Sequence, residues 1–89
     1  MVLLINYELK DTTKDYTSFF EAIKANCYQW WHFLEPTWIV ATTLSADAFA
    51  KLLYPHMLNT DSLLVVQIGQ NHQGWLKTEA WDWLNRQTY

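Results

Sequence analysis

Short apolar runs recur along the chain and predict four β-strands. The first run is Val2–Leu9, which begins Val-Leu-Leu-Ile and gives way to a polar loop. The others are Trp30–Leu34, Trp38–Thr43 and Leu63–Ile68. Their lengths and their content of β-branched and aromatic residues are typical of strands, and the Glu-Pro-Thr segment between the second and third predicts a hairpin turn.

Between these runs the apolar residues change to helical spacing. A first helix is predicted to end near Asn26–Gln29, and Ser18 with Glu21 offers a capping box at its start. A second helix is predicted to begin after Ser45, a good N-cap, and to end or bend at Pro55. The chain therefore alternates strand and helix in a recognisable order.

That order is β-α-β-β-α-β, followed by a C-terminal extension in which Thr78 is expected to cap a short helix over Glu79–Arg86. It predicts one α+β domain with a ferredoxin-like sandwich, whose core covers about residues 1–69 and whose extension covers about 70–89. In this fold the first and third strands are central, and two helices cover one face of the sheet. A chain of 89 residues fits a single domain of this kind.

The predicted sheet is apolar on both faces. Along the first strand, Leu3, Ile5 and Tyr7 point one way, while Val2, Leu4, Asn6 and Glu8 point the other way. Two helices can cover only one of these faces. The other face is expected to meet the C-terminal helix, a second subunit, or both.

The composition strengthens the case for a partner and weakens the case for nucleic acid. Hydrophobic residues make up 51% of the chain and aromatic residues 17%, which is more apolar surface than a small globule readily hides. The net charge is −3, and the six basic residues are scattered, whereas nucleic-acid binders carry a basic patch. Cys27 is the single cysteine, which excludes an intramolecular disulfide and leaves a small buried hydrophobe or a reactive thiol as alternatives.

No signal peptide or membrane span is expected, because the N-terminal apolar run is short and lacks a basic start. A cytoplasmic protein is therefore predicted. The apolar surface predicts a homodimer, and a further protein partner is possible. Neither nucleic acid nor a membrane is an expected partner.

The six tryptophans serve either as core and interface residues or as a platform for stacking bases. Base stacking needs basic groups beside the rings to hold the backbone, and WWHFLEPTWIV contains none. Core or interface roles are therefore favoured. The residues expected at an interface are Trp31, Trp38, Trp75, Trp81 and Trp83.

The candidates for chemistry lie where the first strand ends. Glu8, with Asn6 and Asp11, could form a catalytic set, and two Glu8 side chains brought together at a dimer axis could hold Mg²⁺. The alternative is a solvated strand end that leads into a polar loop. The three histidines lack ligand spacing, and the loop GQNHQG lacks the lysine and the spacing of a phosphate loop.

The segments INYELK, WWHFLEPTWIV, LYPHM, DSLLVV and AWDWL, in this order, resemble a family of small bacterial and phage proteins labelled SinR-like. The likeness extends more distantly to the small ferredoxin-fold subunit of CRISPR adaptation and to VapD-type endoribonucleases. It implies a ferredoxin-like homodimer, joined through sheet faces or a C-terminal segment, in a mobile-element or defence setting. Relatives that cleave nucleic acid place a metal-binding aspartate at the end of the first strand, where this chain has Glu8.

Two functions are compatible with these observations. The favoured one is a non-catalytic homodimeric ferredoxin-like module that binds a protein or small ligand, without a cofactor. A phage-encoded inhibitor of a host protein would share the same physical features. The alternative is a metal-dependent endonuclease or endoribonuclease toxin, which would use Glu8 and Mg²⁺.

Overall fold

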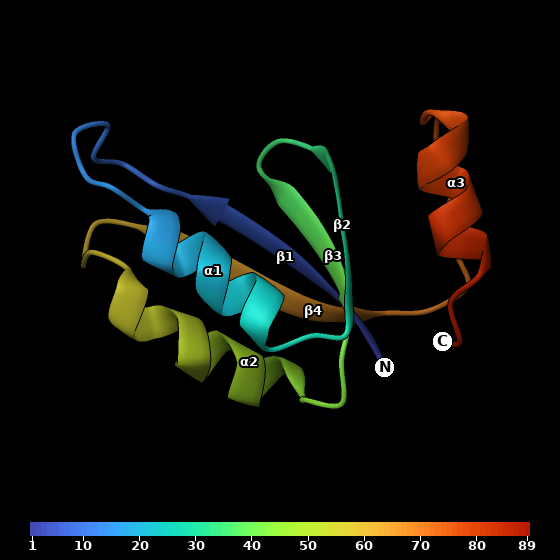
Figure 1. The fold of residues 1–89 in the computed structure, drawn as a ribbon, viewed down its shortest axis with the longest axis horizontal. Coiled ribbons are helices and arrows are strands. Elements are labelled where there is room, and N and C mark those ends of the chain that lie inside the picture. The colour runs from blue at the N-terminus through green and yellow to red at the C-terminus, as the bar shows by residue number, and fades with distance from the viewer.

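The computed structural model of the protein describes residues 1–89 as an α+β fold. Four strands and three α-helices follow one another along the chain, with a short 3₁₀ turn after the second helix (Figure 1). In order they are β1 (Val2–Glu8), α1 (Thr17–Ala25), β2 (Gln29–Leu34), β3 (Thr37–Ala41), α2 (Ala46–Leu53), η1 (Tyr54–His56), β4 (Ser62–Ile68) and α3 (Thr78–Asn85). Each strand boundary lies within two residues of its predicted position.

The four strands form one open antiparallel sheet in the order β2-β3-β1-β4. The first and third strands are central, as the sequence predicts. Strand β1 pairs with β4 over seven consecutive residues, from Val2 opposite Ile68 to Glu8 opposite Ser62. Strand β2 pairs with β3 less regularly, because the register shifts between Trp31 and Leu34.

One face of the sheet, which we call the first face, is covered by α1 and α2. These helices lie next to each other along one side of the sheet, whereas α3 stands apart from them (Figure 1). The core between the two helices and the first face contains ten buried residues: Leu3, Ile5, Tyr7, Tyr16, Phe19, Ile23, Trp38, Val40, Phe49 and Leu53. Burial of this many large side chains is the main source of stability available to so small a domain.

The helix starts test the predicted caps individually. The Oγ of Ser45 accepts a hydrogen bond from the amide of Ala48 at 3.1 Å, so this N-cap is confirmed. The capping box of Ser18 and Glu21 is wrong, because α1 already includes Thr17 and Ser18, and Tyr16 occupies the N-cap position. Similarly, Thr78 is the first residue of α3 and not its cap.

Candidate ligand-binding site

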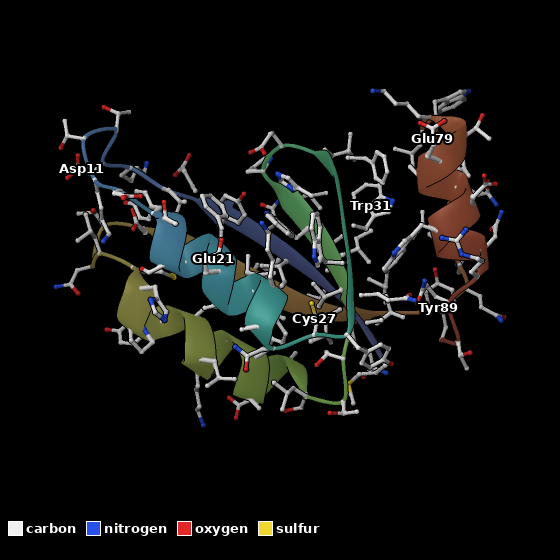
Figure 2. The ribbon with its side chains drawn as sticks, viewed as in Figure 1. Asp11, Glu21, Cys27, Trp31, Glu79 and Tyr89 are labelled. Carbon is white, nitrogen blue, oxygen red and sulfur yellow. The ribbon has the colours of Figure 1, made fainter.

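The opposite side of the sheet, the second face, is covered by α3 at one end only. Val2, Trp31 and Ile39 of the sheet pack there against Ala80 and Leu84 of α3, and all five are buried. The indole Nε1 of Trp31 donates a hydrogen bond to the carbonyl oxygen of Ala80 at 3.2 Å. Figure 2 shows Trp31 on the side of β2 that faces α3. This small second core attaches the C-terminal extension to the sheet.

Next to the second core, a pocket of about 540 Å³ lies between the second face and the returning chain. Leu4, Ile39 and Ile68 line it from the sheet, and Trp81 and Leu84 line it from α3. The other lining residues come from β2, the start of β3, the end of β4 and the loop before α3: Trp31, Leu34, Thr37, Gln67, Gly69, Asn71, His72, Gln73, Gly74, Trp75 and Leu76. Its volume lies within the range of pockets that bind small molecules.

No aspartate, glutamate, lysine or arginine is among these sixteen lining residues. Its polar groups are instead amides, a hydroxyl and an imidazole. The Oγ1 of Thr37 accepts a hydrogen bond from the Nδ2 of Asn6 at 2.8 Å, which fixes the hydroxyl at the edge of the pocket. This lining suits an uncharged ligand, because a buried charge without a partner is costly.

His72 is the titratable residue of the pocket. Its Nδ1 lies 2.7 Å from the carbonyl oxygen of Gly69, an acceptor, so we assign the proton of the neutral ring to Nδ1. The Nε2 atom is then a hydrogen-bond acceptor. The ring stacks on Trp81 with 6.3 Å between centroids and lies 5.1 Å from the ring of Tyr89. The sequence identified this segment only as a polar loop.

The residues predicted for chemistry do not come together in one chain. The carboxylate of Glu8 is exposed and pairs with the Nζ of Lys10 at 2.8 Å. Asn6 bonds to Thr37, as described above, and the carboxylate of Asp11 accepts hydrogen bonds from Thr13. Asp11 lies in the loop at the opposite end of the molecule from α3 (Figure 2). No group of three or more histidine, cysteine, aspartate or glutamate side chains is placed to hold a metal ion.

The five tryptophans expected at an interface fall into three groups. Trp31 and Trp38 are only 1% and 4% exposed, which corrects the expectation for these two, because they are buried within the chain's own cores. Trp81 and Trp83 are half-buried beside the second core. Trp75 is 98% exposed and lines the pocket. Among the five, it offers the most surface to a partner.

Trp30 and Trp38 lie on the first face and have a basic neighbour, Lys24, from outside their own segment of the sequence. Trp38 donates from Nε1 to the hydroxyl of Tyr7 at 3.1 Å and stacks on His32 with 4.2 Å between centroids. Trp30 lies against Trp38, and the Nζ of Lys24 sits 5.1 Å from the Trp30 ring. The expectation that no basic group lies near these rings is therefore wrong, because α1 brings a lysine to them. This single cation–π contact is far short of a basic patch.

Cys27 lies at the turn between α1 and β2 (Figure 2). Burial raises the pKa of its thiol to about 11, because the thiolate would lose hydration there. Its Sγ donates to the carbonyl oxygen of Ile23 at 3.3 Å. Of the two alternatives for this residue, the packed, unreactive thiol fits the structure.

Comparisons of the chain with protein-family models, with curated proteins and with solved structures find no match. The resemblance to the SinR-like proteins therefore stays a prediction. The longest helix, α1, has nine residues, and none of the helices has the length and apolar character needed to cross a bilayer.

Proposed function

We propose that the protein is a non-catalytic homodimeric binding module that holds a small, uncharged and mainly apolar molecule between the second face and α3. The observation that carries the proposal is the pocket itself, with a volume of about 540 Å³ and no charged side chain in its lining. Indole and aliphatic groups supply its contact area, and a few amides and one imidazole can orient a ligand. This combination is typical of small-molecule sites.

The proposal includes a ferredoxin-like architecture. It is supported by the element order β1-α1-β2-β3-α2-β4, by the central position of β1 and β3, and by the two helices on the first face. The helix α3 is then an addition that partly closes the second face. A relation to the SinR-like proteins belongs to the same proposal and rests on the sequence segments quoted above.

The dimer is supported by the apolar surface that the single chain leaves exposed. The side chains of Tyr54, Leu64 and Leu58 are 67%, 60% and 37% exposed, although similar residues of the first-face core are fully buried. Small domains rarely leave so many large apolar groups in water without a partner. A second copy of the chain is the commonest partner for such a surface.

Binding can be tested with N-phenyl-1-naphthylamine, an uncharged aromatic probe whose fluorescence rises in apolar sites. We expect saturable binding of one probe per chain. Leu34 lines the pocket and is half exposed, so its substitution leaves the cores intact. Leu34→Asp would place a carboxylate beside the probe and weaken binding by at least about tenfold, because the charge loses hydration on ligand entry.

The matched control is Leu34→Asn, which has nearly the same shape without the charge. We expect it to weaken binding by less than about threefold, since the polar amide can still reach water. Absence of saturable binding to the wild type would refute the proposed pocket. Binding that Leu34→Asp leaves unchanged would place the probe elsewhere and would also contradict the proposal.

A further inference from the structure

The strand β4 forms an edge of the sheet that lacks the usual protection. It contains seven residues, pairs with β1 without any register shift, and has no charged residue, proline or glycine. Natural edge strands usually carry such a feature, because a regular edge pairs readily with other strands. No residue of 62–68 takes part in a backbone hydrogen bond outside the regular helix and strand bonds. The outward-facing amides and carbonyls of β4 therefore have no backbone partner in the chain.

The other edge strand, β2, has the protection that β4 lacks. Its register against β3 shifts between Trp31 and Leu34, and a turn containing Pro36 follows it directly. The helix α3 also contacts β2. A shifted register twists an edge and interrupts its row of hydrogen-bonding groups. Only β4 therefore offers a long, regular edge for pairing.

Exposed apolar side chains border β4 on both faces. On the second face, Leu64 and Val66 are 60% and 36% exposed. On the first face, Tyr54 and Leu58 are 67% and 37% exposed and line a hollow of about 480 Å³ together with Leu63. An edge that also carries apolar groups above and below gains both hydrogen bonds and buried area when another strand pairs with it.

We propose that β4 pairs in antiparallel orientation with β4 of a second copy, about a two-fold axis at Val65, so that the two sheets become one of eight strands. The inference rests on the proposed dimer and names its interface. In this register Leu64 lies opposite Val66 of the second copy, on the same face, and Ser62 lies opposite Ile68. All seven residues of each strand are paired.

A second copy is the proposed partner because β4 is an uncharged, regular edge that can pair with an identical edge. The chain is net negative, so two copies repel each other over much of their surface, but β4 itself has no charge to repel. The carboxylate of Asp61, the residue before β4, already accepts hydrogen bonds from the amides of Lys10 and Leu58 and from the hydroxyl of Tyr16. Two identical uncharged strands can therefore meet without a penalty from like charges.

A disulfide can locate the axis. In a chain with Cys27→Ala as background, Val65→Cys would place two thiols directly opposite each other, with Cα atoms about 4.5–5.5 Å apart, within the range that a disulfide spans. We expect most of the chain to form a covalent dimer under mild oxidation. The control is Tyr28→Cys, since Tyr28 precedes β2, at the other edge of the sheet, and is 66% exposed. It should form little covalent dimer at the same protein concentration.

Charge changes can break and restore the same interface. The double variant Leu64→Lys with Val66→Lys would place lysines opposite lysines, and we expect the dissociation constant of the dimer to rise at least about tenfold. The variant Leu64→Lys with Val66→Glu would place opposite charges together and should retain most of the dimer. Circular dichroism of each variant shows whether it is folded.

The outcomes separate this inference from the proposed dimer. If the wild type is a dimer, but Val65→Cys does not cross-link and the double lysine variant dimerises as tightly as the wild type, the β4 interface is wrong while the proposed dimer remains supported. A folded wild-type chain that stays monomeric at all accessible concentrations would overturn both.

Discussion

The two faces of the sheet are similar in chemistry but differ in how they are covered. On the first face, Leu3 and Ile5 have no exposed surface, because α1 and α2 pack over them. On the second face, Leu64 is 60% exposed and Leu34 is 49% exposed, although both are leucines of the same sheet. The helix α3 covers the end of this face near Val2 and leaves a pocket beside it.

The difference shows that the second face is not simply a weaker core. A face that served only stability would be expected to carry polar side chains wherever helices do not cover it. Here the uncovered part keeps Leu64 and Val66 beside its polar residues, and the pocket next to it has no charged lining residue. The first face therefore contains the main core, while the second face leaves apolar side chains that α3 does not cover.

The largest expected difference between the two faces is in the stability lost when a leucine on each is replaced by alanine. Leu3→Ala on the first face should lower the free energy of unfolding by about 2–5 kcal/mol, because it leaves a cavity in a fully packed core. Leu34→Ala on the second face should lower it by less than about 0.5 kcal/mol. Urea denaturation followed by circular dichroism measures both, and equal losses would show that the faces are not distinct.

A smaller effect is expected from the second core. Leu84→Ala removes a buried side chain of α3 that is 4% exposed, and we expect a loss of about 2–3 kcal/mol because the neighbouring pocket lets the site relax. Hydrogen exchange should increase first in residues 70–89, while the first-face strands keep their protection. Uniform loss of protection throughout the chain would mean that α3 is an integral part of one core.

A milder substitution at the contact between Trp31 and α3 tests the same attachment. Trp31→Phe keeps an aromatic ring but removes the Nε1 donor, so the carbonyl oxygen of Ala80 loses its 3.2 Å partner. We expect destabilisation of about 1–2 kcal/mol from the lost hydrogen bond and the smaller ring. Urea denaturation and the exchange rates of the α3 amides report it. Unchanged exchange in α3 would argue against this attachment.

The smallest expected effect comes from Asp61, the residue immediately before β4, and it depends on pH. Burial disfavours the charge of Asp61, but hydrogen bonds from Lys10, Leu58 and Tyr16 outweigh it and hold the pKa of this carboxyl below its usual range. A lowered folded-state pKa contributes stability above the unfolded value, near pH 4, and this contribution is lost as the pH falls through the lowered pKa.

Asp61→Asn should therefore reduce stability near neutral pH and should flatten its dependence on pH below about pH 4. Urea denaturation at several pH values between 2 and 7 measures this, with Asp47→Asn on the exposed surface of α2 as the control. An Asp61→Asn variant that keeps the full acid sensitivity of the wild type would contradict the role given to this carboxylate.

Most of the fold could be predicted from local patterns. Apolar runs such as Leu63–Ile68 predict strands closely, because their short length and β-branched residues favour an extended chain. Helix starts were harder, since several polar residues compete for one cap. The carboxylate of Asp15 bonds to both the amide and the hydroxyl of Thr17, so α1 starts there and not after Ser18. At α2, by contrast, the predicted N-cap Ser45 is the cap that forms.

The pocket could not be predicted in the same way. It forms because the chain after β4 returns across the second face, which brings His72 and Trp75 near Leu4, far away in sequence. The loop GQNHQG has no hydrophobic period that would reveal this path. The burial of Trp31 was missed for the same reason, since its partner is the distant Ala80.

The central claim is that the β4 edge and the apolar side chains beside it are left uncovered in the single chain because β4 of a second chain pairs with them. Sedimentation equilibrium of the wild-type protein, from nanomolar to high micromolar concentrations, tests this claim most directly. The account predicts a reversible transition to a species with twice the chain mass of 10.6 kDa. A single folded species of 10.6 kDa over the whole range would contradict it.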